Sequence, residues 1–491
     1  MKMKPYLLAA GAALAVALPA AARAEIACAD LAHIRLPHAE VTSAKVETLR
    51  SGEACRVLVT SRPTRDSDIR IEVMIPLGSA WNGKLVQVGN GGLAGAIPSA
   101  AIKARAELGY AAAGTDDGHV GNGRTALWAL GHPEKIRDFG TRSLKETTDT
   151  AKALILAQTG GPVRRSYFIG CSAGGREALM EAQRFPNDFD GIVAGAPANY
   201  NTLSTGGRAY MQQMLARPGA YLDLAALQLL QDAALKQCAG GGAFIRDQQA
   251  CRFDPGVLRC KPAQSSACLT APQLAAARAL YSGRPGPGSR STFPGYTPGG
   301  EAQPGGYQAW NTGASQAAIG EASGHAISSQ FMKYFVYGDP SFDFLKADLG
   351  PKYDRDRQKT AALLDAVNPD LTPFRSHGGK LIQYHGWNDP AIPPLGSPRY
   401  YTEVGRKTGD TSSFYRLYMI PGMLHCRGGA GPGEVDWLEV LDRWVTKGDA
   451  PGSLTARADA GNATQLLCPY PGVARADGKG GWTCAVSKRK G

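Results

Sequence analysis

Several features that define other protein classes are missing from this sequence of 491 residues. Beyond residue 24 there is no apolar stretch long enough to span a bilayer, so a membrane is not an expected partner. Despite a net charge of +12 at pH 7, no basic stripe with interleaved aromatic residues occurs, which argues against nucleic acid as a partner. The sequence has no C-x-x-C pair, which weakens any assignment as a thiol–disulfide enzyme, and it has no internal repeat.

The first 24 residues have the pattern of a secretory signal peptide. Lys2 and Lys4 precede an apolar run over residues 7–18, and residues 22–24 read Ala-Arg-Ala, which predicts cleavage before Glu25. The protein is therefore expected to be secreted or periplasmic. That compartment is oxidising, so the 10 cysteines, an even number, are expected to be paired.

The most informative stretch is residues 170–174, Gly-Cys-Ser-Ala-Gly, which has the G-x-S-x-G form of a nucleophile elbow centred on Ser172. The apolar run 167–169 before it predicts a buried strand, and residues 175–185 after it predict a helix that ends at Pro186. This strand–turn–helix context indicates a nucleophilic serine. The alternative is a glycine-rich turn in which the serine is incidental.

A cysteine adjoins the serine, and another adjoins a histidine far along the chain. Cys171 precedes Ser172, and Cys426 follows His425. A disulfide holds two Cα atoms about 5.5–6 Å apart. If these cysteines are bonded, the serine and the histidine come close together, as a hydroxyl nucleophile requires of its base. The alternative is two unrelated cysteines.

A glycine-rich loop follows the predicted strand 84–88 and reads Gly-Asn-Gly-Gly over residues 89–92. In proteins with a nucleophile elbow, two backbone N–H groups form the oxyanion hole. One belongs to the residue that follows the nucleophile, and the other belongs to a loop that follows an earlier strand of the sheet. The predicted donors are Ala173 together with Gly91 or Gly92, since glycine lets the backbone approach a substrate closely. The alternative for the loop is a plain turn.

The remaining two members of a catalytic triad are predicted from strand ends. Asp389 follows the predicted strand 381–385, and His425 follows the predicted strand 414–420. Catalytic groups lie at the carboxyl ends of strands in open α/β sheets. The order Ser172, Asp389, His425 is the order found in α/β-hydrolases and differs from the chymotrypsin and subtilisin orders.

Two other histidines receive structural interpretations. His119 follows two aspartates in a loop before a predicted helix, where loop or capping roles explain these residues more simply than catalysis. His385 lies near the end of a predicted strand, before the loop that carries Asp389, and is interpreted as structural.

Strands that alternate with helices predict an α/β protein with a parallel sheet covered on both faces. The alternation stops near residue 199 and resumes near residue 373. We therefore expect an α/β-hydrolase fold with a large inserted lid domain: the core is formed by residues 25–199 and 373–491, and the lid by residues 200–372. The lid carries four cysteines, many aromatic residues and a Gly/Pro/Ser-rich segment, 283–306, that predicts a loop.

Three motifs together resemble the tannase/feruloyl esterase family, α/β-hydrolases that include mono(2-hydroxyethyl) terephthalate hydrolase-like enzymes. They are Gly-Cys-Ser-Ala-Gly-Gly-Arg at 170–176, Gly-Trp-Asn-Asp at 386–389 and His-Cys-Arg-Gly-Gly at 425–429. The resemblance covers essentially all of the chain after the signal peptide. It implies that Ser172, Asp389 and His425 form the triad. It also implies five disulfides: Cys28–Cys55, Cys171–Cys426, Cys238–Cys251, Cys260–Cys268 and Cys468–Cys484.

The resemblance also implies a structural calcium ion in the lid, bound by an aspartate-rich loop between two cysteines. In this chain the interval from Cys238 to Cys251 contains one carboxylate, Asp247. Calcium takes 6–8 oxygen ligands, several of them charged. The sequence therefore predicts no metal site there, and the proposed chemistry needs no cofactor.

These observations predict a secreted serine ester hydrolase that acts on esters of aromatic acids through an acyl-enzyme. The sequence does not choose among feruloyl, galloyl, benzoyl and terephthaloyl esters, and it does not predict an oligomeric state. Two alternatives are an acyltransferase that uses the same triad and a non-catalytic protein that binds polyphenols or carbohydrates.

Overall fold

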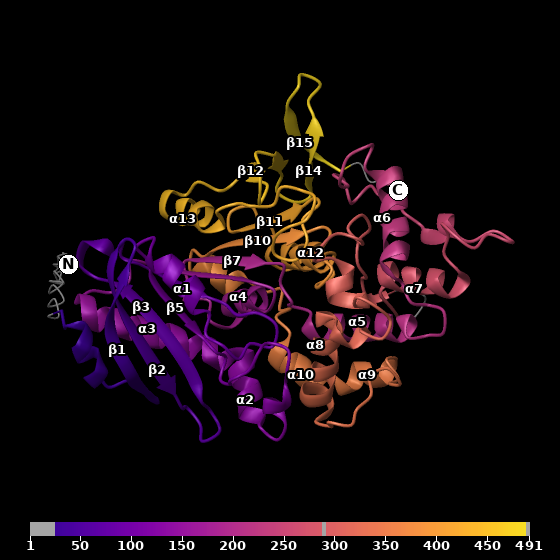
Figure 1. Ribbon diagram of the computed structural model, residues 1–491. Helices are drawn as coiled ribbons and strands as arrows, with labels where there is room; N and C mark the ends of the chain where they lie inside the picture. The colour runs from indigo at the N-terminus through magenta and orange to yellow at the C-terminus, as the bar shows by residue number, and fades with distance from the viewer. Residues whose placement is uncertain (1–24, 287–290, 488–491) are drawn as a thin grey trace, which may run out of the picture.

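The computed structural model describes residues 25–286 and 291–487 (Figure 1). The predicted signal peptide, residues 1–24, lies outside the described residues. Among the described helices, none combines the length and the apolar composition needed to cross a bilayer.

A nine-stranded sheet forms the centre of the molecule, in the order β1-β2-β3-β5-β4-β6-β7-β10-β11. The first three strands form an antiparallel meander that joins β5 antiparallel, whereas the strands from β5 to β11 are parallel. The N-terminal meander is thus an extension of the predicted parallel sheet. The strands are β1 (Ala39–Leu49), β2 (Gly52–Ser61), β3 (Ile69–Pro76), β4 (Lys84–Val88), β5 (Ala111–Thr115), β6 (Arg165–Cys171), β7 (Gly191–Gly195), β10 (Lys380–Gly386) and β11 (Tyr415–Ile420).

Helices cover both faces of this sheet, which confirms the predicted fold class. On one face, α1 (Ser99–Ala106) and α13 (Trp437–Lys447) pack on side chains of the central strands. On the other face lie α3 (Ser143–Thr159), α4 (Ala173–Arg184) and α12 (Gly396–Thr408). The central strands are short and apolar because both of their faces are buried.

The chain from 200 to 372, which we call the lid, packs at one end of the sheet (Figure 1). It has an apolar cluster of its own, which includes Leu227, Leu274 and Tyr307. The segment predicted as a loop, 283–306, contains two short paired strands, so that prediction was wrong in part. The lid elements are α5 (Asn201–Leu215), α6 (Leu224–Cys238), α7 (Ala271–Ser282), β8 (Arg284–Pro285), β9 (Ser291–Phe293), α8 (Ser323–Phe331), α9 (Pro351–Asp356) and α10 (Gln358–Leu364).

Shorter elements complete the chain. Two C-terminal hairpins follow α13, and the second of them extends away from the body of the molecule (Figure 1). These elements are α2 (Pro133–Arg137), α11 (Thr372–Ser376), β12 (Leu454–Arg457), β13 (Thr464–Leu467), β14 (Gly472–Ala476) and β15 (Trp482–Val486).

All ten cysteines form disulfides, as the exported character of the sequence predicts. The five pairs are those that the family resemblance implied: Cys28–Cys55, Cys171–Cys426, Cys238–Cys251, Cys260–Cys268 and Cys468–Cys484.

Candidate active site

Ser172 occupies the sharp turn between β6 and α4. Its backbone has φ 65° and ψ −120°, a region that residues with a side chain rarely adopt and that costs about 1–3 kcal/mol. The turn is held by a 3.0 Å hydrogen bond from the Ser172 N–H to the carbonyl of Gly195. Gly175 allows this approach, because a Cβ atom there would lie 2.2 Å from the same carbonyl oxygen. The local sequence thus produces the strained elbow that the motif predicts.

The disulfide between Cys171 and Cys426 joins the elbow to the loop after β11. The two Cα atoms are 6.1 Å apart, although the residues are separated by 255 positions in sequence. Ser172 and His425 are the immediate chain neighbours of these cysteines, so the bond holds the segments that carry them together at the carboxyl edge of the sheet.

Asp389 and His425 are directly hydrogen-bonded. The Nδ1 atom of His425 lies 2.7 Å from Oδ2 of Asp389, in a carboxyl group that is fully buried. The other oxygen, Oδ1, accepts the backbone N–H groups of Ala391 at 2.7 Å and Ile392 at 2.9 Å. This is the arrangement in which a carboxylate orients an imidazole and leaves its Nε2 atom free for a hydroxyl.

A second histidine contacts the same carboxylate oxygen. Nε2 of His385 lies 3.0 Å from Oδ2 of Asp389, and His385 is as fully buried as its partner. Burial alone would raise the pKa of Asp389. The charge of His425 and the hydrogen bonds from both histidines outweigh burial and hold this pKa well below its usual range. Asp389 is therefore an anion at neutral pH.

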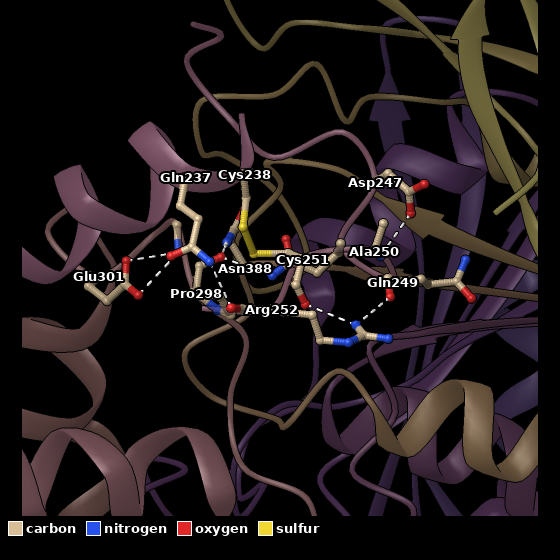
Figure 2. Close-up of a disulfide and its surroundings, with 12 residues drawn as sticks. Gln237, Cys238, Asp247, Gln249, Ala250, Cys251, Arg252, Pro298, Glu301 and Asn388 are labelled. Atoms are coloured by element: carbon tan, nitrogen blue, oxygen red, sulfur yellow. Dashed lines mark hydrogen bonds between the residues drawn. A yellow bond between two sulfur atoms is a disulfide. The ribbon is translucent and has the colours of Figure 1, made fainter. Parts of the chain in front are cut away.

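The lid holds the loop that carries Asp389. Asn388 donates its side-chain amide to the carbonyl of Pro298 at 3.1 Å, as Figure 2 shows. The side chain of Asn311 donates to the carbonyl of Pro390 at 2.8 Å, and Arg208 and Tyr296 both donate to the carbonyl of Ala391. The lid therefore fixes the position of Asp389, the acid of the candidate triad, as well as covering one end of the sheet.

The glycine-rich loop after β4 is attached to α4. The N–H of Asn90 donates to Oε2 of Glu177 at 2.9 Å, and the carbonyl of Asn90 accepts the N–H of Gly174 at 2.8 Å. A Cβ atom at Gly174 would lie 2.8 Å from that carbonyl oxygen, so this close contact requires glycine. The loop and the start of α4 thus form one unit.

Three backbone donors of this unit are available to a ligand. Within the described residues, the N–H groups of Gly91, Gly92 and Ala173 have no acceptor in the protein. Ala173 is the first residue of α4, where N–H groups lack an intrahelical partner and the helix dipole favours negative charge. The geometry is compatible with the predicted oxyanion hole and leaves both glycines as candidates for its second donor.

One aromatic side chain of the lid lies against the candidate base. The indole of Trp310 meets the imidazole of His425 edge to face, with ring centroids 5.0 Å apart. Trp310 is half-buried, in a short helical turn over Gln308–Thr312. An aromatic side chain of the lid therefore lies directly beside the candidate base.

His119 is part of a separate aromatic cluster. Its ring stacks on Trp128 at a centroid distance of 3.7 Å, beside Phe139. Burial lowers the pKa of His119 to about 4, so this imidazole is neutral at pH 7. These contacts agree with a structural interpretation.

The loop closed by the Cys238–Cys251 disulfide contains one carboxylate, that of Asp247. Figure 2 shows this disulfide, with Asp247 turned toward the backbone of Ala250. The carboxylate of Asp247 accepts hydrogen bonds from Arg475 at 2.8 Å and from the hydroxyl of Ser487 at 2.9 Å. Among the described residues, no group of three or more His, Cys, Asp or Glu side chains could hold a metal ion. The positive group beside the Asp247 carboxylate is the guanidinium of Arg475.

Comparison with known proteins shows the family of this chain. The family model for tannase and feruloyl esterase matches residues 55–490. The chain belongs to the tannase and feruloyl esterase family. Members of this family are ester hydrolases, and the protein is a carboxylic ester hydrolase.

The relatives of this family member include bacterial and fungal esterases. An uncharacterized esterase of Xanthomonas campestris pv. campestris is 36% identical, over 93% of this chain and 89% of its own length. A probable feruloyl esterase of Arthroderma benhamiae is 30% identical, over 87% of this chain and 83% of its own. Feruloyl esterase B from Aspergillus oryzae superposes with a TM-score of 0.84, at 25% identity, over 93% of this chain and 99% of its own. Tannin acyl hydrolase from Aspergillus niger has the same fold, with a TM-score of 0.76 at 21% identity over 92% of each chain.

Two contacts in this esterase have no clear signal in its sequence. His385 was interpreted as structural, yet its imidazole contacts the candidate triad's aspartate. Glu177, in the first turn of the predicted helix, accepts a hydrogen bond from a loop 87 residues earlier in the chain. The sequence does contain one hint for Glu177: it is an acidic residue in a helix that is expected to pack on the sheet. A buried carboxylate needs a hydrogen-bond partner.

Proposed function

We propose that the protein is an exported serine esterase that hydrolyses esters of aromatic acids, with Ser172, His425 and Asp389 as its triad. The proposal rests above all on the 2.7 Å hydrogen bond between Asp389 and His425, a histidine that the Cys171–Cys426 disulfide ties to the serine elbow. Export is supported by the signal-peptide pattern and by five disulfides, which persist in oxidising compartments.

The mechanism is a two-step acyl transfer. His425 takes the proton of the Ser172 hydroxyl as the oxygen attacks the ester carbonyl, and Asp389 stabilises the imidazolium. The N–H groups of Ala173 and of Gly91 or Gly92 bind the oxyanion, at about 3–4 kcal/mol per donor. The alcohol leaves with a proton from His425. Water, activated by the same histidine, then releases the acid and regenerates the serine.

The preference for aromatic acids is supported by two observations. Trp310 places an aromatic edge beside His425. The relatives named above include proteins called feruloyl esterases and a tannin acyl hydrolase.

A hydrolysis panel tests the proposal. Methyl ferulate, methyl gallate, methyl benzoate and a terephthalate monoester are each compared with methyl butyrate, and release of the acid is measured without any added alcohol. We expect at least one aromatic ester to be hydrolysed with a higher kcat/KM than the aliphatic ester. Faster turnover of methyl butyrate would contradict the aromatic preference. Product formation only after an alcohol acceptor is added would indicate a transferase.

A further inference from the structure

We propose that His385 is a positioning residue of this esterase: its Nε2–H donates to Oδ2 of Asp389 and fixes the carboxylate in the orientation that serves His425. The inference rests on the proposed function, in which Asp389 and His425 belong to the triad. It assigns a role in the reaction to a histidine that would otherwise count as part of the core.

The protonation of His385 follows from its neighbours. Nε2 faces two acceptors, Oδ2 of Asp389 at 3.0 Å and the carbonyl oxygen of Ile392 at 3.3 Å, so this nitrogen must carry a hydrogen. The other ring nitrogen, Nδ1, lies 2.7 Å from the hydroxyl of Ser397. That hydroxyl accepts the side-chain amide of Gln383 at 2.6 Å, which leaves its own hydrogen free to be donated to Nδ1.

The result is a directional chain of hydrogen bonds that ends on the triad. The hydroxyl of Tyr415 donates to the amide oxygen of Gln383, the amide of Gln383 to Ser397, Ser397 to His385, and His385 to Asp389. Each member is at most 1% exposed, so water does not compete for these bonds. An imidazole with its hydrogen on Nε2 agrees with the direction of every hydrogen bond in this chain.

The consequence for Asp389 follows from its full set of partners. Each of its oxygens accepts two N–H donors: Oδ1 from Ala391 and Ile392, and Oδ2 from His385 and His425. Without the donor from His385, only His425 would hold Oδ2. The carboxylate could then rotate about Oδ1, the oxygen held by the backbone. Its negative charge would no longer be stabilised by His385, so it would attract the His425 imidazolium more strongly.

The other ionisable groups around the carboxylate do not change charge between about pH 5 and pH 9. They are Tyr296, Tyr307 and Arg208 of the lid. Burial raises the pKa of both tyrosines, which keeps them neutral, and the guanidinium remains charged. Burial raises the pKa of Glu301, which lies beyond Tyr307, to about 7. Every variant compared below retains Glu301, so its titration does not contribute to the differences between their pH profiles.

The test compares two substitutions of His385. His385→Leu removes both ring nitrogens, whereas His385→Gln keeps an amide donor at about the position of Nε2. The kcat and KM of each variant are measured from pH 5 to pH 9 with the ester of the panel that the wild type hydrolyses fastest. We expect His385→Leu to lower kcat on the order of tenfold or more, since a misplaced catalytic group is costly even over about 1 Å. KM should change little.

The pH profile separates positioning from simple packing. If His385 stabilises the charge on Asp389, its removal makes the His425 imidazolium harder to deprotonate. The acid limb of the kcat/KM profile then moves to higher pH, by about half a unit or more in His385→Leu. His385→Gln should recover most of kcat and of the wild-type profile.

Tyr415→Phe is the matched control. It removes a buried hydroxyl from the far end of the same chain without changing the direction of any bond nearer to Asp389. We expect a lower melting temperature but an unchanged pH profile. Ser397→Ala provides a second variant in case His385→Leu does not fold: it releases Nδ1, so it should shift the acid limb in the same direction by a smaller amount.

Three results would overturn the inference: a folded His385→Leu enzyme with wild-type kcat and pH profile, a His385→Gln enzyme no better than His385→Leu, or an unshifted profile in Ser397→Ala. Failure of the proposed function itself gives a different result, because Ser172→Ala would then retain activity whatever the His385 variants do.

Discussion

Cys171 and Cys426 form a disulfide whose two members are the immediate neighbours of Ser172 and His425. Both Ser172 and Cys426 have positive φ angles, 65° and 64°, so the backbone is constrained on both sides of the bond. The covalent link thus connects the candidate nucleophile and the candidate base independently of the sheet that carries them.

Replacing both Cys171 and Cys426 by Ala is expected to lower kcat at least tenfold in protein that is still folded. The bond closes a loop of 255 residues, so its loss also costs about 5 kcal/mol of stability by a chain-entropy estimate. Catalysis must therefore be measured at a temperature where circular dichroism shows the variant folded. The matched control replaces Cys260 and Cys268, which close a loop of 8 residues in the lid. Equal kcat in the two double variants would mean that the Cys171–Cys426 bond only stabilises the fold.

Ser172→Ala is expected to lower kcat on every accepted ester by about 10⁴–10⁶ without loss of the fold, because the nucleophile is removed. The hydroxyl makes no contribution to the backbone hydrogen bond that holds the elbow. Steady-state hydrolysis rates and circular dichroism measure the two effects separately. A folded variant that retains more than a tenth of wild-type activity would rule out Ser172 as the nucleophile.

Glu177→Ala is expected to lower kcat about 10–100-fold with little change in KM, because the N–H of Asn90 loses its acceptor and the loop with Gly91 and Gly92 is free to move. Glu177→Gln retains a carbonyl oxygen at the same position and should keep most of the activity. The two variants are compared at equal folded fraction. Wild-type kcat in Glu177→Ala would show that the loop holds its shape without this contact.

Chelation with excess EDTA is expected to shift the melting temperature little, because Asp247 is paired with Arg475 and Ser487. Arg475→Gln should lower the melting temperature by about one or two degrees at most, since the guanidinium is 41% exposed and exposed ion pairs are worth roughly 0.2–1 kcal/mol. Differential scanning fluorimetry with EDTA, and after readdition of calcium, checks both statements. A fall of many degrees that calcium reverses would reveal a site built from backbone carbonyls.

Glu301→Gln is expected to raise the melting temperature by roughly 2–4 °C at pH 8 and to have little effect at pH 4.5. Burial raises the pKa of Glu301 to about 7, although Tyr281 and Gly299 donate hydrogen bonds to it. A carboxyl whose folded pKa is raised favours the folded state fully below its unfolded pKa, near 4.5, and loses that contribution as the pH rises to about 7. The amide does not titrate, so the gain should appear between these limits and stay constant above pH 7.

The exposed Glu40→Gln serves as the control for this pH dependence. Its melting temperature should follow that of the wild type at every pH. If the melting temperatures of Glu301→Gln and of the wild type differ by the same amount at every pH from 4.5 to 8, the pKa of Glu301 is not raised in the folded protein.

The sequence predicts that a helix or strand is present more accurately than it predicts where a helix begins or how the N-terminal strands join the sheet. The sequence pattern over residues 221–236 predicts a helix, but α6 begins at Leu224, because the side chain of Asp223 accepts the N–H of Ala226 and caps the helix there. The pattern over residues 434–447 predicts another helix, but α13 begins at Trp437, after the cap at Asp436. The pairing of β3 with β5, which joins the N-terminal strands to the main sheet, depends on contacts between distant segments that no local pattern records.

The sequence by itself determined the elbow at Ser172, the order of Ser172, Asp389 and His425, and the family. These follow from short-range requirements: small residues in a tight turn, apolar runs that form buried strands, and motifs whose residues are adjacent in the chain. Tertiary structure alone decided that His385 shares a carboxylate oxygen with His425, and that Glu177 holds Asn90. Both contacts depend on where side chains from separate elements point after packing, and hydrogen bonds of about 3 Å between such groups leave no periodic trace in a sequence.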